Sequence, residues 1–220
     1  MTVPSGTTLT FNNSNKPVFT GKLIKDGAGT MVLSASMTHL TGVTVAEGIM
    51  KHGATSVFSN NGKTIEVLDG AAYDFNGNGN GNAVYYKIAG SGPDGLGALR
   101  NTGADGTNGQ AQMSGLELTA DALIRGTASF GMINASYNTS ALVLNNHTLT
   151  LDMPSGKTFW IATANSSSAG TIYVKSGTFY PLRNDKDLKL PNVDVVIDGS
   201  AAVFKSRPTA PRPARSSPSP

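Results

Sequence analysis

The sequence predicts an all-β protein of the solenoid class, a parallel β-helix with coils of about 22 residues. Two observations lead to this prediction: short strand-like segments end in glycine at a regular spacing, and no stretch of the chain carries a helical pattern. The segments combine β-branched residues with a glycine at the last position. They read "VTVAEG" (43–48), "IEVLDG" (65–70), "IYVKSG" (172–177) and "DVVIDG" (194–199).

The spacing between these segments is the stronger of the two observations. The offset from Val45 to Val67 is identical to the offset from Val174 to Val196. A repeat of roughly 20 to 50 residues is typical of architectures in which each unit buries its apolar face only against its neighbours. The sequence therefore predicts coils that stack along one axis.

Alternation within the segments predicts which side chains fill the core. Successive side chains of a strand point to opposite faces, so every second residue faces inward. Glycine at the end of each segment permits a positive φ, which a sharp corner requires. The residues expected to point inward are Val43, Val45, Ile65, Val67, Ile172 and Val174.

The rest of the chain up to residue 205 fits the same prediction. No window of ten residues holds apolar residues at helical spacing without an interrupting glycine or proline, so we expect almost no helix. We expect one solenoid domain over 1–205, with irregular loops near 76–115, and a disordered Pro/Ser/Arg-rich tail over 206–220. Further strand-like runs are "TLTF" (8–11), "TMVLS" (30–34), "VYYKIA" (84–89), "LELTADALI" (116–124), "ALVLNNHTLTLDM" (141–153) and "KTFWIATA" (157–164).

Charge argues against nucleic acid as a partner. The net charge of +3 comes from Arg207, Arg212 and Arg215 in the tail, because removing these three from 17 basic residues leaves 14 against 14 acidic ones. A protein that binds nucleic acid clusters Lys and Arg to neutralise phosphates. We therefore expect no nucleic-acid partner.

Cysteine and hydropathy bear on the compartment. The chain has no cysteine, so it has neither disulfides nor thiolate metal sites, which is compatible with export in an unfolded state. The opening "MTVPSGTTLTFNN" shows no basic segment followed by an apolar core, and no window of about 18 apolar residues is present. We expect no direct membrane insertion. If the protein is exported, we expect its leader to lie outside this sequence.

The run "KDGAGTMVLSASMTHLTGVTVAEGIM" (25–50) resembles the autotransporter-associated β-strand repeat, also called the passenger-associated transport repeat. The repeat reads approximately K-x-G-x-G-T-x-x-L-S, a short spacer, then T-G-x-T-x-V-x-x-G. After Gly48 this chain has Ile49–Met50 in place of the usual Thr–Leu pair. The matching residues are Lys25, Gly27, Gly29, Thr30, Leu33, Ser34, Thr41, Gly42, Thr44, Val45 and Gly48.

The resemblance implies a right-handed parallel β-helix in a secreted or surface-displayed bacterial passenger. It implies a structural, export-assisting element with no catalytic residues and no cofactor. Partners would be surface glycans or host and cell-surface proteins. A longer chain would add further solenoid rungs and an outer-membrane translocator.

Two short motifs suggest ligand sites and are interpreted as turns. "GSGPDG" (Gly90, Gly92, Gly95) fits G-x-G-x-x-G, but Pro93 and Gly97 prevent the helix that a dinucleotide site needs. "DFNGNG" (74–79) looks like the first half of a calcium loop, with Asp74, Asn76 and Asn78 as oxygen ligands. The closing glutamate at the twelfth position is Tyr85, so only a weak Ca²⁺ site near Asp74 would be left.

The alternative hypothesis is a carbohydrate-active or carbohydrate-binding β-helix, similar to a polysaccharide lyase or a glycosidase. It depends on whether carboxylates cluster on one face. Such enzymes need two or three carboxylates on one face, often with Lys or Arg. The default interpretation of each candidate is a solvated corner beside glycine. The candidates are the pair Glu47 and Asp69, the pair Asp198 and Ser176, and the cluster of Asp194 and Asp198 with Lys186 and Lys189 nearby in sequence.

Histidines and aromatic residues complete the set of candidates. His39, His52 and His147 lack partners at metal-ligand spacing, so we expect no metal site. Aromatic side chains pointing outward could stack on sugars, whereas the simpler interpretation places Phe and part of the Tyr set in the core. The aromatic candidates are Tyr85, Tyr86, Trp160, Tyr173, Phe179 and Tyr180. We therefore expect a non-catalytic structural or adhesive protein, with the carbohydrate-directed β-helix as the alternative.

Overall fold

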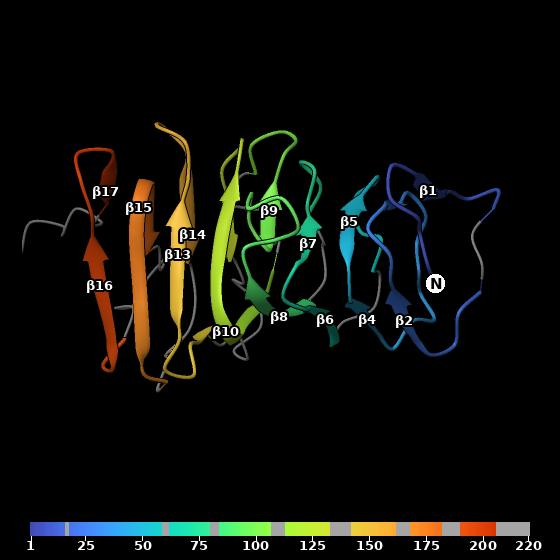
Figure 1. Ribbon diagram of the computed structural model, residues 1–220, viewed down its shortest axis with the longest axis horizontal. Coiled ribbons are helices and arrows are strands. Elements are labelled where there is room, and N and C mark those ends of the chain that lie inside the picture. The colour runs from blue at the N-terminus through green and yellow to red at the C-terminus, as the bar shows by residue number, and fades with distance from the viewer. Residues whose placement is uncertain are drawn as a thin grey trace, which may run out of the picture.

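The computed structural model is a β-solenoid, in which parallel strands stack side by side along the long axis (Figure 1). It describes residues 1–15, 18–58, 62–79, 84–106, 113–132, 142–161, 168–181 and 190–205. Within these ranges every regular element is a strand, and all strand pairs are parallel. The predicted fold class is confirmed. The predicted tail lies outside the described residues.

The strands form three walls of the solenoid. The first wall contains β2 (Lys22–Lys25), β4 (Gly42–Val45), β6 (Lys63–Val67), β8 (Val84–Gly90), the first part of β10 (Gly115–Gly126) and β12 (Leu142–Val143). The second wall contains β1 (Thr8–Phe11), β3 (Thr30–Leu33), β5 (Gly48–His52), β7 (Ala71–Asp74), β9 (Leu99–Asn101), the second part of β10, β13 (Thr148–Asp152), the first part of β15 (Gly170–Pro181) and β16 (Val193–Ile197). The third wall contains β11 (Phe130–Met132), β14 (Thr158–Ile161), the second part of β15 and β17 (Ala202–Phe204).

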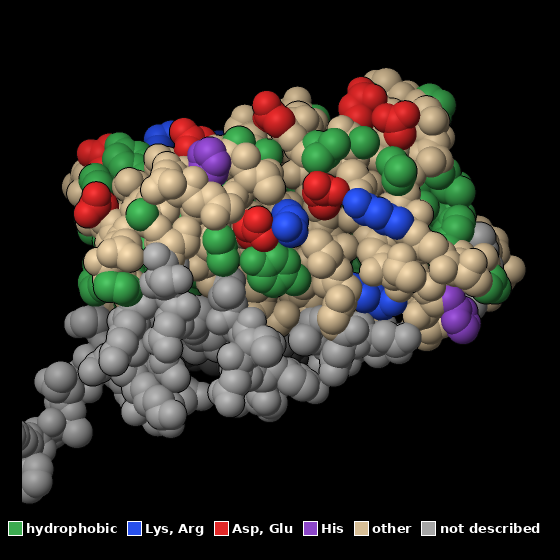
Figure 2. Space-filling model, turned by 90° about the horizontal axis from the view of Figure 1, so that it is seen from below, with side chains coloured by type: hydrophobic (Ala, Val, Ile, Leu, Met, Phe, Trp, Pro, Cys, Tyr) green, Lys and Arg blue, Asp and Glu red, His purple; other side chains and the backbone are tan. Residues whose placement is uncertain are grey.

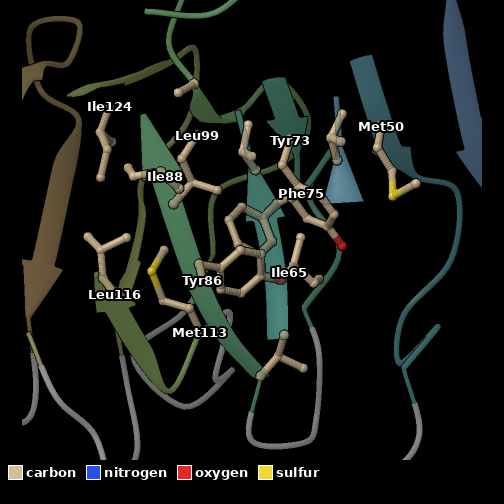
Figure 3. Packing of buried hydrophobic residues seen from close by; sticks show 14 of the residues in the cluster. Met50, Ile65, Tyr73, Phe75, Tyr86, Ile88, Leu99, Met113, Leu116 and Ile124 are labelled. Atoms are coloured by element: carbon tan, nitrogen blue, oxygen red, sulfur yellow. The ribbon is translucent and has the colours of Figure 1, made fainter. Parts of the chain in front are cut away.

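One ladder of core residues runs through the second wall. Its steps differ in length, the shortest leading from Met31 to Met50 and the longest from Ile124 to Leu151, and the coils average slightly more residues than predicted. Four members are labelled in Figure 3. This core ladder consists of Leu9, Met31, Met50, Tyr73, Leu99, Ile124, Leu151, Val174 and Ile197.

The two predicted strand alignments have different outcomes. Val45 pairs with Val67 as the spacing predicted. Val174 pairs with Ile197, and Val196 lies opposite Tyr173, so the second predicted alignment is wrong by one residue. A slip of one residue turns every side chain to the other face. The observed register directs Val195 and Ile197 inward and leaves Asp194 on the outer side.

Aromatic side chains fill the third wall and the centre of the rod. Phe75, Phe130 and Phe159 form a chain with ring centroids 5.7 and 5.3 Å apart. Phe159 is opposite Phe179, which packs edge to face on Phe204. Tyr73, Phe75 and Tyr86 meet at the middle of the molecule (Figure 3). Phe in the core agrees with the simpler interpretation of the aromatic residues.

The corners are made by residues with positive φ. The predicted glycines Gly48, Gly70, Gly177 and Gly199 have φ values between 67° and 84°. The "NNH" corner uses Asn145 and Asn146, both with positive φ, and asparagine tolerates this conformation better than most residues do. The stretch 76–115, predicted to be irregular, holds β8 and β9 as regular members of the stack, with turns or bends before β8, between the two strands and after β9 in the described residues.

Candidate functional site

The residues that follow the core-ladder residues in the sequence form a second column, on the outer side of the second wall. From the third coil onward every member is charged. We call this set the charged column: Lys51, Asp74, Arg100, Arg125, Asp152, Lys175 and Asp198. Because side chains alternate along a strand, a residue that follows an inward one faces outward. On the first wall, Glu66 lies opposite Lys87 and Lys87 lies opposite Glu117, and Figure 2 shows a face of the rod on which acidic and basic side chains alternate near the middle.

Ion pairs connect successive members of the charged column. Lys51 Nζ is 3.5 Å from Asp74 Oδ2, and Lys175 Nζ is 3.2 Å from Asp152 Oδ2. Arg125 Nη1 approaches the same Asp152 oxygen at 3.9 Å. Opposite charges directly across a strand pair stabilise it, and like charges destabilise it. The pairs of Lys51 with Asp74 and of Arg125 with Asp152 therefore favour the observed register, whereas Arg100 lies opposite Arg125 and needs a counterion from elsewhere.

Arg100 is adjacent to a second arginine, Arg125, and takes its counterion from a loop. Its Nη1 donates to both carboxylate oxygens of Asp94, at 2.9 and 2.8 Å. The guanidinium is nearly buried, whereas Asp94 is partly exposed. The "GSGPDG" loop is thus a turn, as interpreted, with Gly92 and Gly95 at positive φ. It carries the carboxylate that balances a buried cation.

Asp74, the candidate calcium ligand, is engaged by hydrogen-bond donors. Its Oδ1 accepts from the backbone N–H groups of Asn76 at 2.8 Å and Thr102 at 3.1 Å. Its Oδ2 accepts from the Thr102 hydroxyl at 2.6 Å and faces Lys51. The side chain of Asn76 donates to the His52 carbonyl. The motif is a corner in which one carboxylate links two coils.

Asn101 makes the neighbouring corner and was missed by the sequence reasoning. Its Oδ1 accepts from Gly77 N–H at 2.7 Å, and its Nδ2 donates to the carbonyls of Ala104 at 2.9 Å and Ser129 at 3.2 Å. One fully buried amide therefore connects three successive coils. A lone asparagine before Thr–Gly gives no signal of this role in the sequence.

Two buried lysines bind backbone carbonyls at other corners. Lys25 Nζ donates to the carbonyl of Gly27, and to that of Glu47 at 2.6 Å. Lys63 Nζ donates to the carbonyl of Leu40. Burial lowers the pKa of both lysines. Lys25 is the first residue of the repeat-like motif, so the structure gives that position a specific role in holding the chain together.

The carboxylate candidates lie at different places along the rod. Glu47 and Asp69 are exposed residues at the corners of successive coils, after the paired residues Val45 and Val67. Asp198 accepts a hydrogen bond from the Tyr173 hydroxyl, and Asp194 faces outward opposite Thr171. The Ser176 hydroxyl donates to Asp152 at 2.7 Å and is not paired with Asp198. Lys186 and Lys189 lie outside the described residues.

Among the described residues, four carboxyl groups have clearly shifted pKa values, and all four shifts are downward. Burial would raise the pKa of Asp94, but hydrogen bonds from Arg100 and the Leu96 N–H outweigh it. The same balance, with Ser176 and Lys175 as donors, lowers the pKa of Asp152. Hydrogen bonds from Lys22 to Glu66, and from Lys157 and Ser129 to Asp105, lower those pKa values as well. A general acid needs a shift in the opposite direction.

The three histidines lie in three different surroundings. His52 is fully buried and bonded to the Tyr73 hydroxyl. His147 Nδ1 lies 3.6 Å from the Asp121 carboxylate at the surface. His39 lines a shallow hollow beside Phe19 and Leu40. No group of three or more His, Asp or Glu side chains among the described residues is arranged to hold a metal ion.

The aromatic candidates do not form a sugar-stacking platform in the described part of the chain. Tyr86, Trp160 and Phe179 are buried. The three half-buried tyrosines lie on three different walls, Tyr85 on the first, Tyr173 on the second and Tyr180 on the third. Each already has a partner: Glu117, Asp198 and the Lys205 ammonium, respectively.

Comparison of the chain with protein-family models, curated proteins and solved structures finds no match. Among the described residues, no helix has the length and apolarity needed to cross a bilayer.

Proposed function

We propose that the protein is a non-catalytic structural or adhesive segment of a secreted or surface-displayed bacterial protein of the autotransporter type. The observation that carries this proposal is the charged column, whose acidic and basic groups are engaged in ion pairs and hydrogen bonds with neighbouring residues of the rod. Asp74, Arg100 and Asp152 each face an opposite charge, and Asp74 and Asp152 also accept hydrogen bonds from neighbouring coils.

The repeat-like motif supports the same proposal. Gly29 lies against the carbonyl of Pro4 so closely that an added Cβ would be 2.2 Å from it, and Gly48 lies similarly close to Gly29 and Lys25. Lys25 adds a bond to the carbonyl of Glu47 in the next coil, beside its local bond to Gly27, so most of these contacts are between coils. Residues that make such contacts build a rod, and a rod suits the display of other surfaces or modules.

A display experiment tests the proposal. The full chain is placed between a signal peptide and an outer-membrane translocator, and its exposure on intact cells is measured by accessibility to added protease. We expect display of the unmodified chain and loss of display for a variant that breaks a coil contact, such as Gly48→Ala. Gly70→Ala is the matched control, because its Cβ would meet no atom within 4 Å.

A turnover experiment separates this proposal from the carbohydrate-active alternative. The purified chain is incubated with neutral and acidic polysaccharides, and new reducing ends and unsaturated products are measured. We expect no turnover. Turnover that disappears in Asp194→Asn or Asp198→Asn would overturn the non-catalytic proposal and support a polysaccharide-cleaving β-helix.

A further inference from the structure

The C-terminal end of the solenoid exposes the side chains that the preceding coil buries. Val195, Ile197 and Phe204 are 38%, 40% and 47% exposed, whereas their partners one coil earlier, Ile172, Val174 and Phe179, are completely buried. Among the described strands, β16 and β17 each pair only with β15. The last coil therefore ends in an apolar surface edged by strands with one unpartnered side.

The composition of residues 206–220, which lie outside the described part of the chain, does not predict a further strand of this kind. Residues 206–220 contain five prolines, at positions 208, 211, 213, 218 and 220. Proline has no N–H to donate to a strand ladder and is excluded from the interior of sheets.

The N-terminal end offers the complementary surface on the second wall. On the first wall, residues 1–3 already lie along the end of β2, because Asp26 N–H donates to the Met1 carbonyl and Val3 N–H to the Asp26 carbonyl. On the second wall, β1 pairs only with β3 among the described strands. Leu9, the first residue of the core ladder, is only partly buried there.

The direction of the strands makes this surface a match for the C-terminal end. All strands of the second wall run in the same direction, so the outer side of β16 has the orientation that the outer side of β1 requires for a parallel pair. We propose that the C-terminal end of the protein docks on the N-terminal end of a second copy, with β16 pairing in parallel with β1. The core ladder then continues from Ile197 to Leu9 of the second copy.

The proposed register fixes which residue of the second copy lies next to the charged Asp198. Asp198 follows Ile197, and Thr10 follows Leu9, so Asp198 comes to lie beside Thr10 of the second copy. Because the two docking surfaces are different, the contact does not close on itself and produces linear chains of copies. This inference concerns self-association and holds wherever the protein resides, so it can fail or succeed independently of the proposed function.

Sedimentation equilibrium of the full chain over a concentration series gives the first test. We expect the mean mass to rise above the monomer and to pass beyond the dimer. Ile197→Lys should weaken association by about tenfold or more, because the docked surface would bury an unpaired charge. Leu68→Lys is the matched control, since Leu68 is equally exposed at 40% but lies at a corner on the side of the rod. A mass that stays monomeric at every concentration overturns the proposal.

A charge swap tests the register without touching a buried residue. Thr10 is exposed, so Thr10→Asp should fold normally while placing a second carboxylate beside Asp198 and weakening association. Asp198→Lys added to Thr10→Asp should restore it. If Thr10→Asp associates as well as the unmodified chain, the proposed pairing of β16 with β1 is wrong.

Mixing two variants distinguishes head-to-tail docking from docking of two C-terminal ends. Ile197→Lys has an intact N-terminal end, and Thr10→Asp has an intact C-terminal end. Head-to-tail docking predicts that the mixture forms dimers and nothing larger, although each variant alone stays largely monomeric. For two docked C-terminal ends, Thr10→Asp would dimerise alone and the mixture would add nothing, which would contradict the proposal.

Discussion

The imidazole of His52 is hydrogen-bonded through Nε2 to the hydroxyl of Tyr73 inside the core, with ring centroids 5.3 Å apart. The two residues come from successive strands of the second wall, β5 and β7. Phe58 and Phe75 pack around the same imidazole. A titratable group is thus enclosed by aromatic rings, with consequences for stability.

The first prediction concerns pH. Burial lowers the pKa of His52 to about 3, although the nearby Asp74 carboxylate acts in the opposite direction. The folded state therefore resists protonation, whereas the unfolded chain binds a proton near the ordinary pKa of about 6.5. The stabilisation is complete above about pH 6.5 and is lost progressively as the pH falls toward 3, by several kcal/mol in total.

Urea unfolding at a series of pH values checks this expectation. In His52→Gln the decline in the free energy of unfolding between pH 6.5 and 4 should be much shallower. Tyr73→Phe is the control that keeps the imidazole, and it should keep the steep decline. An equally steep decline in His52→Gln would mean that other groups cause the acid sensitivity.

The second prediction concerns two corner glycines with similar φ. Gly48 has φ 67° and Gly70 has φ 79°, so alanine at either site is strained by about 1 kcal/mol. At Gly48 the added Cβ would also lie 2.5 Å from the Gly29 carbonyl oxygen. We expect Gly48→Ala to lower the free energy of unfolding by about 3 kcal/mol or more, and Gly70→Ala by about 1 kcal/mol. If denaturant titrations gave equal losses of unfolding free energy for the two variants, the positive φ alone, and not the close contact, would determine the cost of alanine.

The third prediction concerns the buried Lys25. Lys25→Met keeps the length of the side chain and removes the donors to the carbonyls of Gly27 and Glu47. Leaving buried acceptors unsatisfied costs about 1–3 kcal/mol, and chemical denaturation should show a loss of this size. Lys175→Met, which removes an exposed ion pair, should change the free energy of unfolding by less than about 1 kcal/mol.

The fourth prediction concerns the pair formed by Arg100 and Asp94. Arg100→Ala should be more destabilising than Asp94→Ala, because the guanidinium is buried and also packs between coils. In a double-mutant cycle the coupling energy should be about 1–2 kcal/mol, a value discounted for the partial exposure of Asp94. Additive losses would indicate that the bidentate contact contributes nothing and that the loop is held by other means.

The fold class could be predicted because core positions obey a local rule. Val43 and Val45, like Ile65 and Val67, alternate with polar residues and are followed by a corner, so each strand is visible in a short stretch of sequence. The pairing of Val174 was predicted one residue off, because the spacing of Gly177 and Gly199 suggested coils of equal length. In the structure Gly177 lies opposite Ala202, and the two glycines are at different points of their coils.

The charged column could not be predicted from a fixed period. Its members follow the core ladder, and the steps of that ladder are unequal. Lys51 and Asp74 therefore show no common spacing with Arg125 and Asp152 until the register is known. Asp94 is harder still, since only the folded loop brings it to Arg100. Such long-range partners depend on the path of each loop between strands, and local sequence patterns do not determine that path.

The unequal coil lengths have an evolutionary consequence. The circuit from Met31 to Met50 is the shortest along the core ladder and the circuit from Ile124 to Leu151 is the longest, yet both deliver the next side chain to the same place in the stack. A gained or lost codon at a corner is absorbed within one circuit and leaves the neighbouring circuits as they were. Such a chain can change its outline by insertion and deletion, mutations that would disrupt most folds, while its interior stays the same.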